Sequence, residues 1–218
     1  MLETFDFRHH IDKSEYQQVF GELFAALGEC QRSSRAAGVP VILVFEGWDA
    51  AGKGTLLNRV TQALDPRGFT LQAIKTSTQD ERFHPMLWRY WIRLPGNGHW
   101  ALFDRSWYGQ LLTDRLHGEL SAEGLEKGLA DVVQFERQLA EAGAVIVKFW
   151  LQISKHEQKR RFKRLLAKTA TAWKVGPAER EQHRHYEKWC HTADHIICQT
   201  GSSTAPWKVI NDLVSKIW

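Results

Sequence analysis

A glycine-rich segment at residues 44–60, VFEGWDAAGKGTLLNRV, combines residue types that bind phosphate. Gly47, Gly52 and Lys53 have the spacing of a Walker A loop, and they lie between a strand-like apolar run and a helix-like amphipathic run. Backbone N–H groups of such a loop converge on an anion at the helix N-terminus, where the lysine adds positive charge. The segment therefore predicts phosphate binding; the alternative is a glycine-rich turn with a solvated lysine.

Two residues depart from an ordinary Walker A loop. Gly54 stands where the usual loop has the Ser or Thr that binds Mg²⁺, although Thr55 is one position further along. Asp49 places a carboxylate beside the expected phosphate, which is unfavourable unless a cation neutralises it. Such a carboxylate can hold Mg²⁺, can orient or deprotonate an attacking oxygen, or can simply cap the next turn. We favour the first two roles over the cap.

The segment LFDRSWYG, at 102–109, contains a second acid that can act with the loop. Asp104 follows an apolar run typical of a strand, where a Walker B carboxylate would bind Mg²⁺ directly or through water. Arg105 comes next and is a candidate phosphate clamp. An aspartate in this place can also cap the following helix. Because a phosphate-binding loop precedes it in the chain, we favour the Walker B interpretation.

The segment KHEQKRRFKRLLAK, at 155–168, contains seven basic residues and one acid. A solvated helix face normally mixes its charges, so this composition favours contact with a polyanion or with nucleotide phosphates. Phosphoryl transfer also requires cations around the transferred oxygens. The candidate residues in this helix are Arg160, Arg161, Lys163 and Arg164. Arg89 offers further charge upstream, in a segment whose aromatic side chains we expect to pack in the core.

Alternating strand and helix patterns position these residues. The expected strands are 41–46, 69–75, 99–104, 144–153 and 207–210; the expected helices are 14–37, 53–64, 85–94, 107–117, 122–142, 155–168 and 178–194. This order predicts an α/β fold with a parallel sheet covered by helices on both faces, as in P-loop kinase-like three-layer proteins. Ligands bind beyond the carboxyl ends of such strands. We expect one domain over 1–218, with a basic lid at about 154–175.

Composition and net charge exclude some classes of protein, but they do not identify a binding partner. The 218 residues carry a net charge of +4, which predicts an anionic partner but does not say which kind. Three cysteines fit no CxxC spacing, and Cys190 and Cys198 have no second ligand pair nearby at zinc-finger spacing, so we do not expect a zinc site. The sequence shows no signal segment and no 18-residue apolar run, which predicts a cytoplasmic protein without membrane contact.

Together these residues resemble the polyphosphate kinase 2 family. The family loop G-x-D-x-x-G-K-G is matched from Gly47 to Gly54, so the missing Ser or Thr is the family's own pattern. Four further segments are similar to family motifs: DPRGF at 65–69, LWRY at 87–90, DRSWY at 104–108 and STAPW at 203–207. The resemblance covers about residues 14–210. Gln110 is a departure, because many relatives have Arg two residues after the Tyr.

The resemblance implies transfer of a phosphoryl group between inorganic polyphosphate and a purine nucleotide, with Mg²⁺ or Mn²⁺. It implies that Asp49 and Asp104 are the metal and catalytic carboxylates, with Lys53 and Arg105 as catalytic cations. The phosphate- and nucleotide-binding residues that it implies are Gly47, Ala50, Ala51, Gly52, Gly54, Thr55, Lys75 and Arg89. The basic helix would then be the lid that covers polyphosphate.

Two other functions share some of these features. An ATP-dependent nucleoside or nucleotide kinase would also have the loop, the second acid and a lid, but Asp49 and Gly54 count against it. A polyanion- or nucleic-acid-binding module would account for the basic residues, yet no recognition-helix or RNP-like pattern is present, so we expect no nucleic-acid partner. The sequence leaves open AMP against ADP as acceptor, the base, the direction of transfer, and whether the chain forms a homodimer or homotetramer.

Overall fold

The structure, a computed structural model, describes residues 2, 4–7, 13–202 and 205–211. Its centre is a five-stranded sheet in the order β2-β3-β1-β4-β5, in which every neighbouring pair is parallel. The strands are β1 (Val41–Gly47), β2 (Phe69–Ala73), β3 (Trp100–Asp104), β4 (Val145–Gln152) and β5 (Trp207–Asn211). The predicted parallel α/β sheet is confirmed. Of the expected STAPW motif, residues 203 and 204 lie outside the described residues.

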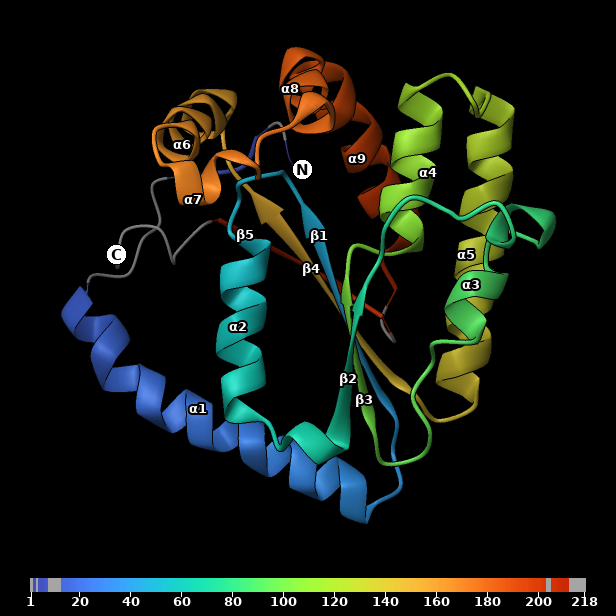
Figure 1. Cartoon of the computed structure of the whole chain (residues 1–218). Coiled ribbons are helices and arrows are strands. Elements are labelled where there is room, and N and C mark those ends of the chain that lie inside the picture. Colours follow the sequence, from blue (N-terminus) through green and yellow to red (C-terminus); the bar gives the residue numbers. More distant parts are fainter. Residues whose placement is uncertain (1, 3, 8–12, 203–204, 212–218) are drawn as a thin grey trace.

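Helices form a layer on each face of this sheet (Figure 1). On one face lie α1 (Lys13–Ala36) and α2 (Lys53–Ala63); on the other lie α4 (Trp107–Leu116), α5 (Ala122–Glu141) and α9 (Tyr186–Thr200), with the short α3 (Trp88–Trp91). Beyond the carboxyl ends of the strands lie α6 (Lys155–Leu166), α7 (Thr169–Ala172) and α8 (Pro177–Arg184). Within the described residues, no helix is both long enough and apolar enough to cross a membrane.

The central strand β1 is apolar from Val41 to Phe45 because both of its faces are covered. Ile42 and Val44 belong to the larger core cluster, which includes buried side chains of α4, α5 and α9. Val41, Leu43 and Phe45 belong to a second cluster against the α2 side. The strand is thereby fixed in register between β3 and β4, and its carboxyl end delivers the glycine-rich loop to the edge of the sheet.

Two of the expected helices have the wrong extent. The helix expected from residue 85 is only four residues long, because Trp88 N bonds the Pro85 carbonyl in a turn and Pro95 prevents continuation. The single helix expected at 178–194 is two helices, α8 and α9, which meet at His185. Tyr186, the first residue of α9, is buried, and its ring stacks on that of Trp48 with the ring centroids 4.0 Å apart. Tertiary packing therefore sets this break.

A buried charged pair connects α4, α5, β4 and the end of α9. Lys148 Nζ donates to Glu136 Oε2 at 2.7 Å, to Tyr108 OH at 3.0 Å and to the Thr200 carbonyl at 2.8 Å. Tyr108 OH in turn donates to Glu136 Oε1 at 2.5 Å. Burial raises the pKa of the Glu136 carboxyl and lowers that of the Lys148 ammonium, while their mutual attraction opposes both shifts. The network anchors α4 to the sheet.

We expect Lys148→Met to lower the free energy of unfolding by about 3–5 kcal/mol, because it leaves the Glu136 carboxylate buried without its counter-ion. Denaturant unfolding measures this. The double variant Lys148→Met with Glu136→Gln should be more stable than the single variant, since the unpaired charge is removed. Equal loss of stability in the two variants would show that pairing of these charges is not what stabilises this region.

Candidate active site

The glycine-rich loop is shaped by close packing against β4. Gly47 has φ 121° and Gly52 has φ 105°, conformations that favour glycine. A Cβ atom on Gly47 would lie 2.3 Å from the Leu151 carbonyl oxygen, so no larger residue fits there. Ala50 also has a positive φ, 61°, which is uncommon for a residue with a side chain. The surrounding contacts therefore hold the loop in one shape.

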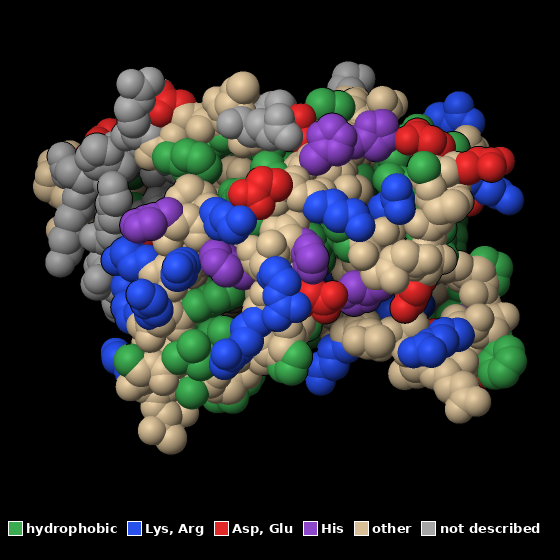
Figure 2. All heavy atoms as spheres, turned by 90° about the horizontal axis from the view of Figure 1, so that it is seen from above, with side chains coloured by type: hydrophobic (Ala, Val, Ile, Leu, Met, Phe, Trp, Pro, Cys, Tyr) green, Lys and Arg blue, Asp and Glu red, His purple; other side chains and the backbone are tan. Residues whose placement is uncertain are grey.

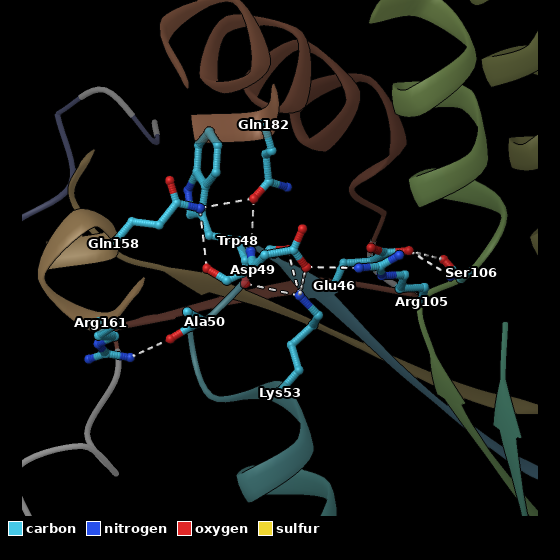
Figure 3. Close-up of polar contacts among 11 residues, drawn as sticks. Glu46, Trp48, Asp49, Ala50, Lys53, Arg105, Ser106, Gln158, Arg161 and Gln182 are labelled. Atoms are coloured by element: carbon cyan, nitrogen blue, oxygen red, sulfur yellow. Dashed lines mark hydrogen bonds and ion pairs between the residues drawn. The ribbon is translucent and has the colours of Figure 1, made fainter. Parts of the chain in front are cut away.

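Lys53 lies over the loop and is largely buried. Its Nζ atom donates to the Gly47 and Trp48 carbonyls, both at 2.9 Å, and lies 3.6 Å from Asp49 Oδ1. The Lys53 side chain therefore faces the space enclosed by the loop, as Figure 3 shows. A lysine held in this way can transfer its hydrogen bonds to a phosphate oxygen that enters the loop.

Asp49 joins the loop to the segment that follows β3. Its Oδ1 atom accepts a hydrogen bond from Arg105 Nη2 at 2.8 Å, and the carboxylate is mostly buried (Figure 3). The charge of Asp49 raises the pKa of the Arg105 guanidinium. The two segments predicted as Walker A and Walker B thus meet through one carboxylate between two cations. Asp49 does not act as a side-chain cap of α2, whose N-terminus has no side-chain cap.

Asp104 lies at the carboxyl end of β3, in register with Phe45 of β1 and Ala73 of β2. It is half-buried, and its charge acts on the neighbouring Arg105. Among the described residues there is no group of three or more His, Cys, Asp or Glu that could hold a metal ion. Asp49 and Asp104 are the residues that could hold a divalent cation such as Mg²⁺ here, because such ions bind through one or two carboxylates together with substrate phosphates.

The first turn of α2 offers backbone donors to an anion. Its N-cap is Gly52, no side chain caps it, and Gly54 and Thr55 are exposed. Uncapped N–H groups at a helix N-terminus bind anions and carry the positive end of the helix dipole. Three amides nearer the start of the loop already have acceptors: Trp48 N bonds the Leu151 carbonyl, Asp49 N bonds Gln182, and Ala51 N bonds the Trp48 carbonyl. The amides at the start of α2, from Gly52 onward, are therefore candidate donors to phosphate.

Two buried glutamines join the helices beyond the sheet to the loop. Gln182 Oε1, on α8, accepts from the Asp49 amide and from Gln158 Nε2, both at 2.9 Å. Gln158 Nε2, on α6, also donates to the Asp49 carbonyl at 3.2 Å, and its Oε1 lies 2.9 Å from His183 Nδ1. Since an amide oxygen only accepts, His183 Nδ1 is the donor. Both main-chain polar groups of Asp49 are therefore held (Figure 3).

Neither glutamine was among the site residues predicted from the sequence. A glutamine in a charged helix has no distinctive pattern, and neither motif spacing nor charge singles it out. One signal was available: Gln158 precedes Phe162 by four residues, which places it on the apolar stripe of the basic helix. A polar residue on an inward-facing stripe requires hydrogen-bond partners inside the protein.

The basic residues of α6 have different surroundings. Arg161 is buried and donates to the Ala50 carbonyl at 2.9 Å and to Glu157 Oε1 at 2.7 Å. Arg160 also pairs with Glu157, and these arginines lower the pKa of Glu157 to about 2. Lys163 and Arg164 are exposed. Figure 2, seen from above the carboxyl ends of the strands, shows Lys and Arg gathered on the side of α6. Arg161 therefore braces the loop, while Lys163 and Arg164 face solvent.

Arg89 has partners outside the loop. Its guanidinium donates to Ser77 Oγ at 2.7 Å and to the Lys75 carbonyl at 2.8 Å, and it lies 3.2 Å from Glu81. Arg93 contacts the same Glu81 carboxylate at 2.8 Å. Arg89 therefore braces the segment after β2, on which Lys75 is exposed. Arg89, which was predicted to bind phosphate, is therefore held by the segment at 75–81.

The parallel sheet, the glycine-rich loop with Lys53 after β1 and the acid at the end of β3 define a P-loop kinase-like α/β protein. Within that class the chain belongs to the polyphosphate kinase 2 family, whose model matches residues 10–215. The resemblance in the sequence is thereby confirmed over nearly the whole chain.

Relatives and solved structures agree with this membership. The chain is 36% identical over 210 residues to a polyphosphate:AMP phosphotransferase of Pseudomonas syringae pv. tomato, covering 96% of this chain and 42% of that protein. It is 31% identical to ADP-polyphosphate phosphotransferase 3 of Rhizobium meliloti, covering 89% and 69%. A polyphosphate kinase 2 structure from Arthrobacter aurescens TC1 matches with TM-score 0.91 and 31% identity, covering 96% and 77%. The chain spans less than half the length of the Pseudomonas syringae relative.

We expect Gln182→Ala to raise the exchange rate of the Asp49 amide about 10-fold or more, because the substitution removes the acceptor of that N–H group. Hydrogen–deuterium exchange followed at the peptide covering 47–52 measures this. Gln62→Ala, which truncates an exposed glutamine on α2, is the matched control and should leave this peptide unchanged. Unchanged exchange in Gln182→Ala would show that α8 does not hold the loop.

Proposed function

We propose that this chain transfers a phosphoryl group between inorganic polyphosphate and a purine nucleotide. The observation that carries the proposal is the contact of Asp49 with Lys53 and Arg105, which brings an acid and two cations to the mouth of a phosphate-binding loop. Membership of the polyphosphate kinase 2 family supports the choice of polyphosphate, and relatives are named as phosphotransferases acting on AMP, ADP or GDP.

In this proposal each of these residues has a separate role in phosphoryl transfer. The uncapped amides from Gly52 onward and Lys53 hold phosphate oxygens, and Arg105 stabilises charge that develops on the transferred group. Asp49 orients the attacking oxygen or receives its proton. Bound Mg²⁺ or Mn²⁺, held by Asp49 and Asp104, would neutralise phosphate charge. Little covalent chemistry is required of the protein, because positioning and electrostatics dominate phosphoryl transfer.

Helices α6, α7 and α8, beyond the carboxyl ends of the strands, act as the lid over this site, in one domain with the sheet. Gln158 and Arg161 attach α6 to the loop, while Lys163 and Arg164 present positive charge outward. A polymer with one negative charge or more per phosphate would follow these exposed cations toward the loop, and its binding would weaken with salt. Acceptor nucleotide then meets the terminal phosphate near Asp49 and Arg105.

The activity is tested by incubating the chain with Mg²⁺ and long-chain polyphosphate, separately with AMP, ADP and GDP, and measuring nucleotide products by chromatography. We expect ADP from AMP, or a triphosphate from ADP or GDP. A parallel reaction supplies ATP as donor with AMP. Transfer from ATP with none from polyphosphate would contradict the proposal and would favour an ATP-dependent nucleotide kinase.

We expect Asp49→Asn and Asp104→Asn each to lower kcat about 100-fold or more, because each removes a carboxylate from the reacting centre. The unfolding midpoint should change little, since both side chains lie at the edge of the sheet. Asp131→Asn, on the exposed surface of α5, is the matched control and should keep normal activity. Near-normal turnover in either site variant would remove that residue from the catalytic set.

We expect Lys163→Gln with Arg164→Gln to raise the KM for polyphosphate about 10-fold while the nucleotide KM changes less than about twofold, because these exposed cations contact the polymer. Arg161 is left intact, since it also braces the loop. The control neutralises two exposed cations of α5, Lys127 and Arg137. A larger rise in the nucleotide KM than in the polyphosphate KM would place the polymer elsewhere.

A further inference from the structure

Glu46 is a buried acid beside the site, and the proposed mechanism gives it no role. The side chain is 4% exposed at the end of β1. Its Oε1 atom accepts three hydrogen bonds: from Ser106 N at 2.7 Å, from Ser106 Oγ at 2.7 Å and from Gly109 N at 3.0 Å. Both Ser106 donors belong to the turn between β3 and α4, and Gly109 N belongs to the first turn of α4. One carboxylate oxygen therefore fixes that turn and the start of α4 to β1. Figure 3 shows the contacts with Ser106.

The bonds from Ser106 lie next to the strained residue of the turn. Arg105 has φ 65°, a left-handed conformation that is uncommon for a residue with a side chain. Its own amide donates to the Phe45 carbonyl at 3.1 Å, and the next amide, that of Ser106, donates to Glu46. Two consecutive residues of β1 thus hold the peptides on both sides of Arg105. Strained conformations persist where the surroundings over-determine them.

Gly109 shows how closely α4 approaches this acid. A Cβ atom at position 109 would lie 3.0 Å from Glu46 Oε1 and 3.2 Å from Oε2. The absence of a side chain at Gly109 therefore lets the first turn of α4 reach the carboxylate. The Ser106 hydroxyl links β1 to α4: it donates to Glu46, and it accepts from Tyr108 N as the N-cap of α4.

We propose that Glu46 is a positioning residue that holds Arg105 in its left-handed conformation, so that the guanidinium faces Asp49 and the transferred phosphoryl group. The inference rests on the proposed function. Burial raises the pKa of the Glu46 carboxyl, while the Ser106 hydrogen bonds and the charge of Lys53 oppose that rise. The alternative is a buried acid that contributes only to stability, and the two roles have different consequences for Arg105.

Hydrogen–deuterium exchange tests the clamp without any need for activity. In Glu46→Ala, the amides of Ser106 and Gly109 lose their acceptor, and we expect the peptide covering 105–110 to exchange about 10-fold faster or more. Gln31→Ala is the matched control: Gln31 is also buried, and it holds the Asp65 main chain at the opposite edge of the sheet. It should leave this peptide unchanged. Unchanged exchange in Glu46→Ala would overturn the proposal.

A double-mutant cycle then separates positioning from stability. We expect Glu46→Ala to lower kcat about 10- to 100-fold in the otherwise unchanged chain, because small displacements of a catalytic group have effects of this size. In an Arg105→Ala background the same substitution should cost less than about twofold, since there is no guanidinium left to position. Equal losses in both backgrounds would overturn the proposal.

A conservative variant covers the case in which Glu46→Ala fails to fold. Glu46→Gln keeps an oxygen that can accept from Ser106, so it should fold, retain more activity than Glu46→Ala and again lose its effect when Arg105 is Ala. If the unmodified chain transfers no phosphate from polyphosphate, the proposed function fails, and the exchange measurement still decides whether Glu46 clamps the turn. An additive effect of Glu46→Gln with Arg105→Ala would count against positioning.

Discussion

The carboxylate of Asp49 lies between two cations, Arg105 at 2.8 Å and Lys53 at 3.6 Å, and the rest of the site depends on this arrangement. A carboxylate beside a phosphate-binding loop would repel phosphate if it were uncompensated. Lys53 at the same time donates to two loop carbonyls, so it is held ready beside the space that phosphate would enter. Positive charge and acid are thus placed before substrate arrives, which is how preorganised sites lower a barrier.

Three separate parts of the fold keep this arrangement in place. Strand β4 fixes the loop through its close approach to Gly47. The lid helices hold the main chain of the loop through Gln158, Gln182 and Arg161. The turn after β3 carries Arg105 and is fastened to β1 through Glu46. If the proposed function holds, a substitution in any of these supports will lower the rate of transfer without touching substrate, since small misplacements in an active site are costly.

The parts of this site that lie in short contiguous motifs could be predicted from the sequence. Gly47, Asp49, Lys53, Asp104 and Arg105 could be named as candidates because a phosphate loop and a strand-end acid have fixed spacing, and the structure places Asp49 in contact with Lys53 and Arg105. The glutamine pair and Glu46 could not, since their partners lie far away in the chain. The break between α8 and α9 likewise depends on Tyr186 stacking against Trp48, a contact that no periodicity reveals. Tertiary packing decided each of these features.

The distances from Lys53 Nζ in a crystal structure of the chain with Mg²⁺, polyphosphate and AMP would test the proposed role of the loop. We predict that Nζ leaves the Gly47 and Trp48 carbonyls for a phosphate oxygen and that this phosphate accepts from the first turn of α2. We also predict that Asp49 and Arg105 flank the AMP phosphate. Phosphates bound away from the loop, with Lys53 Nζ still 2.9 Å from both carbonyls, would contradict that role.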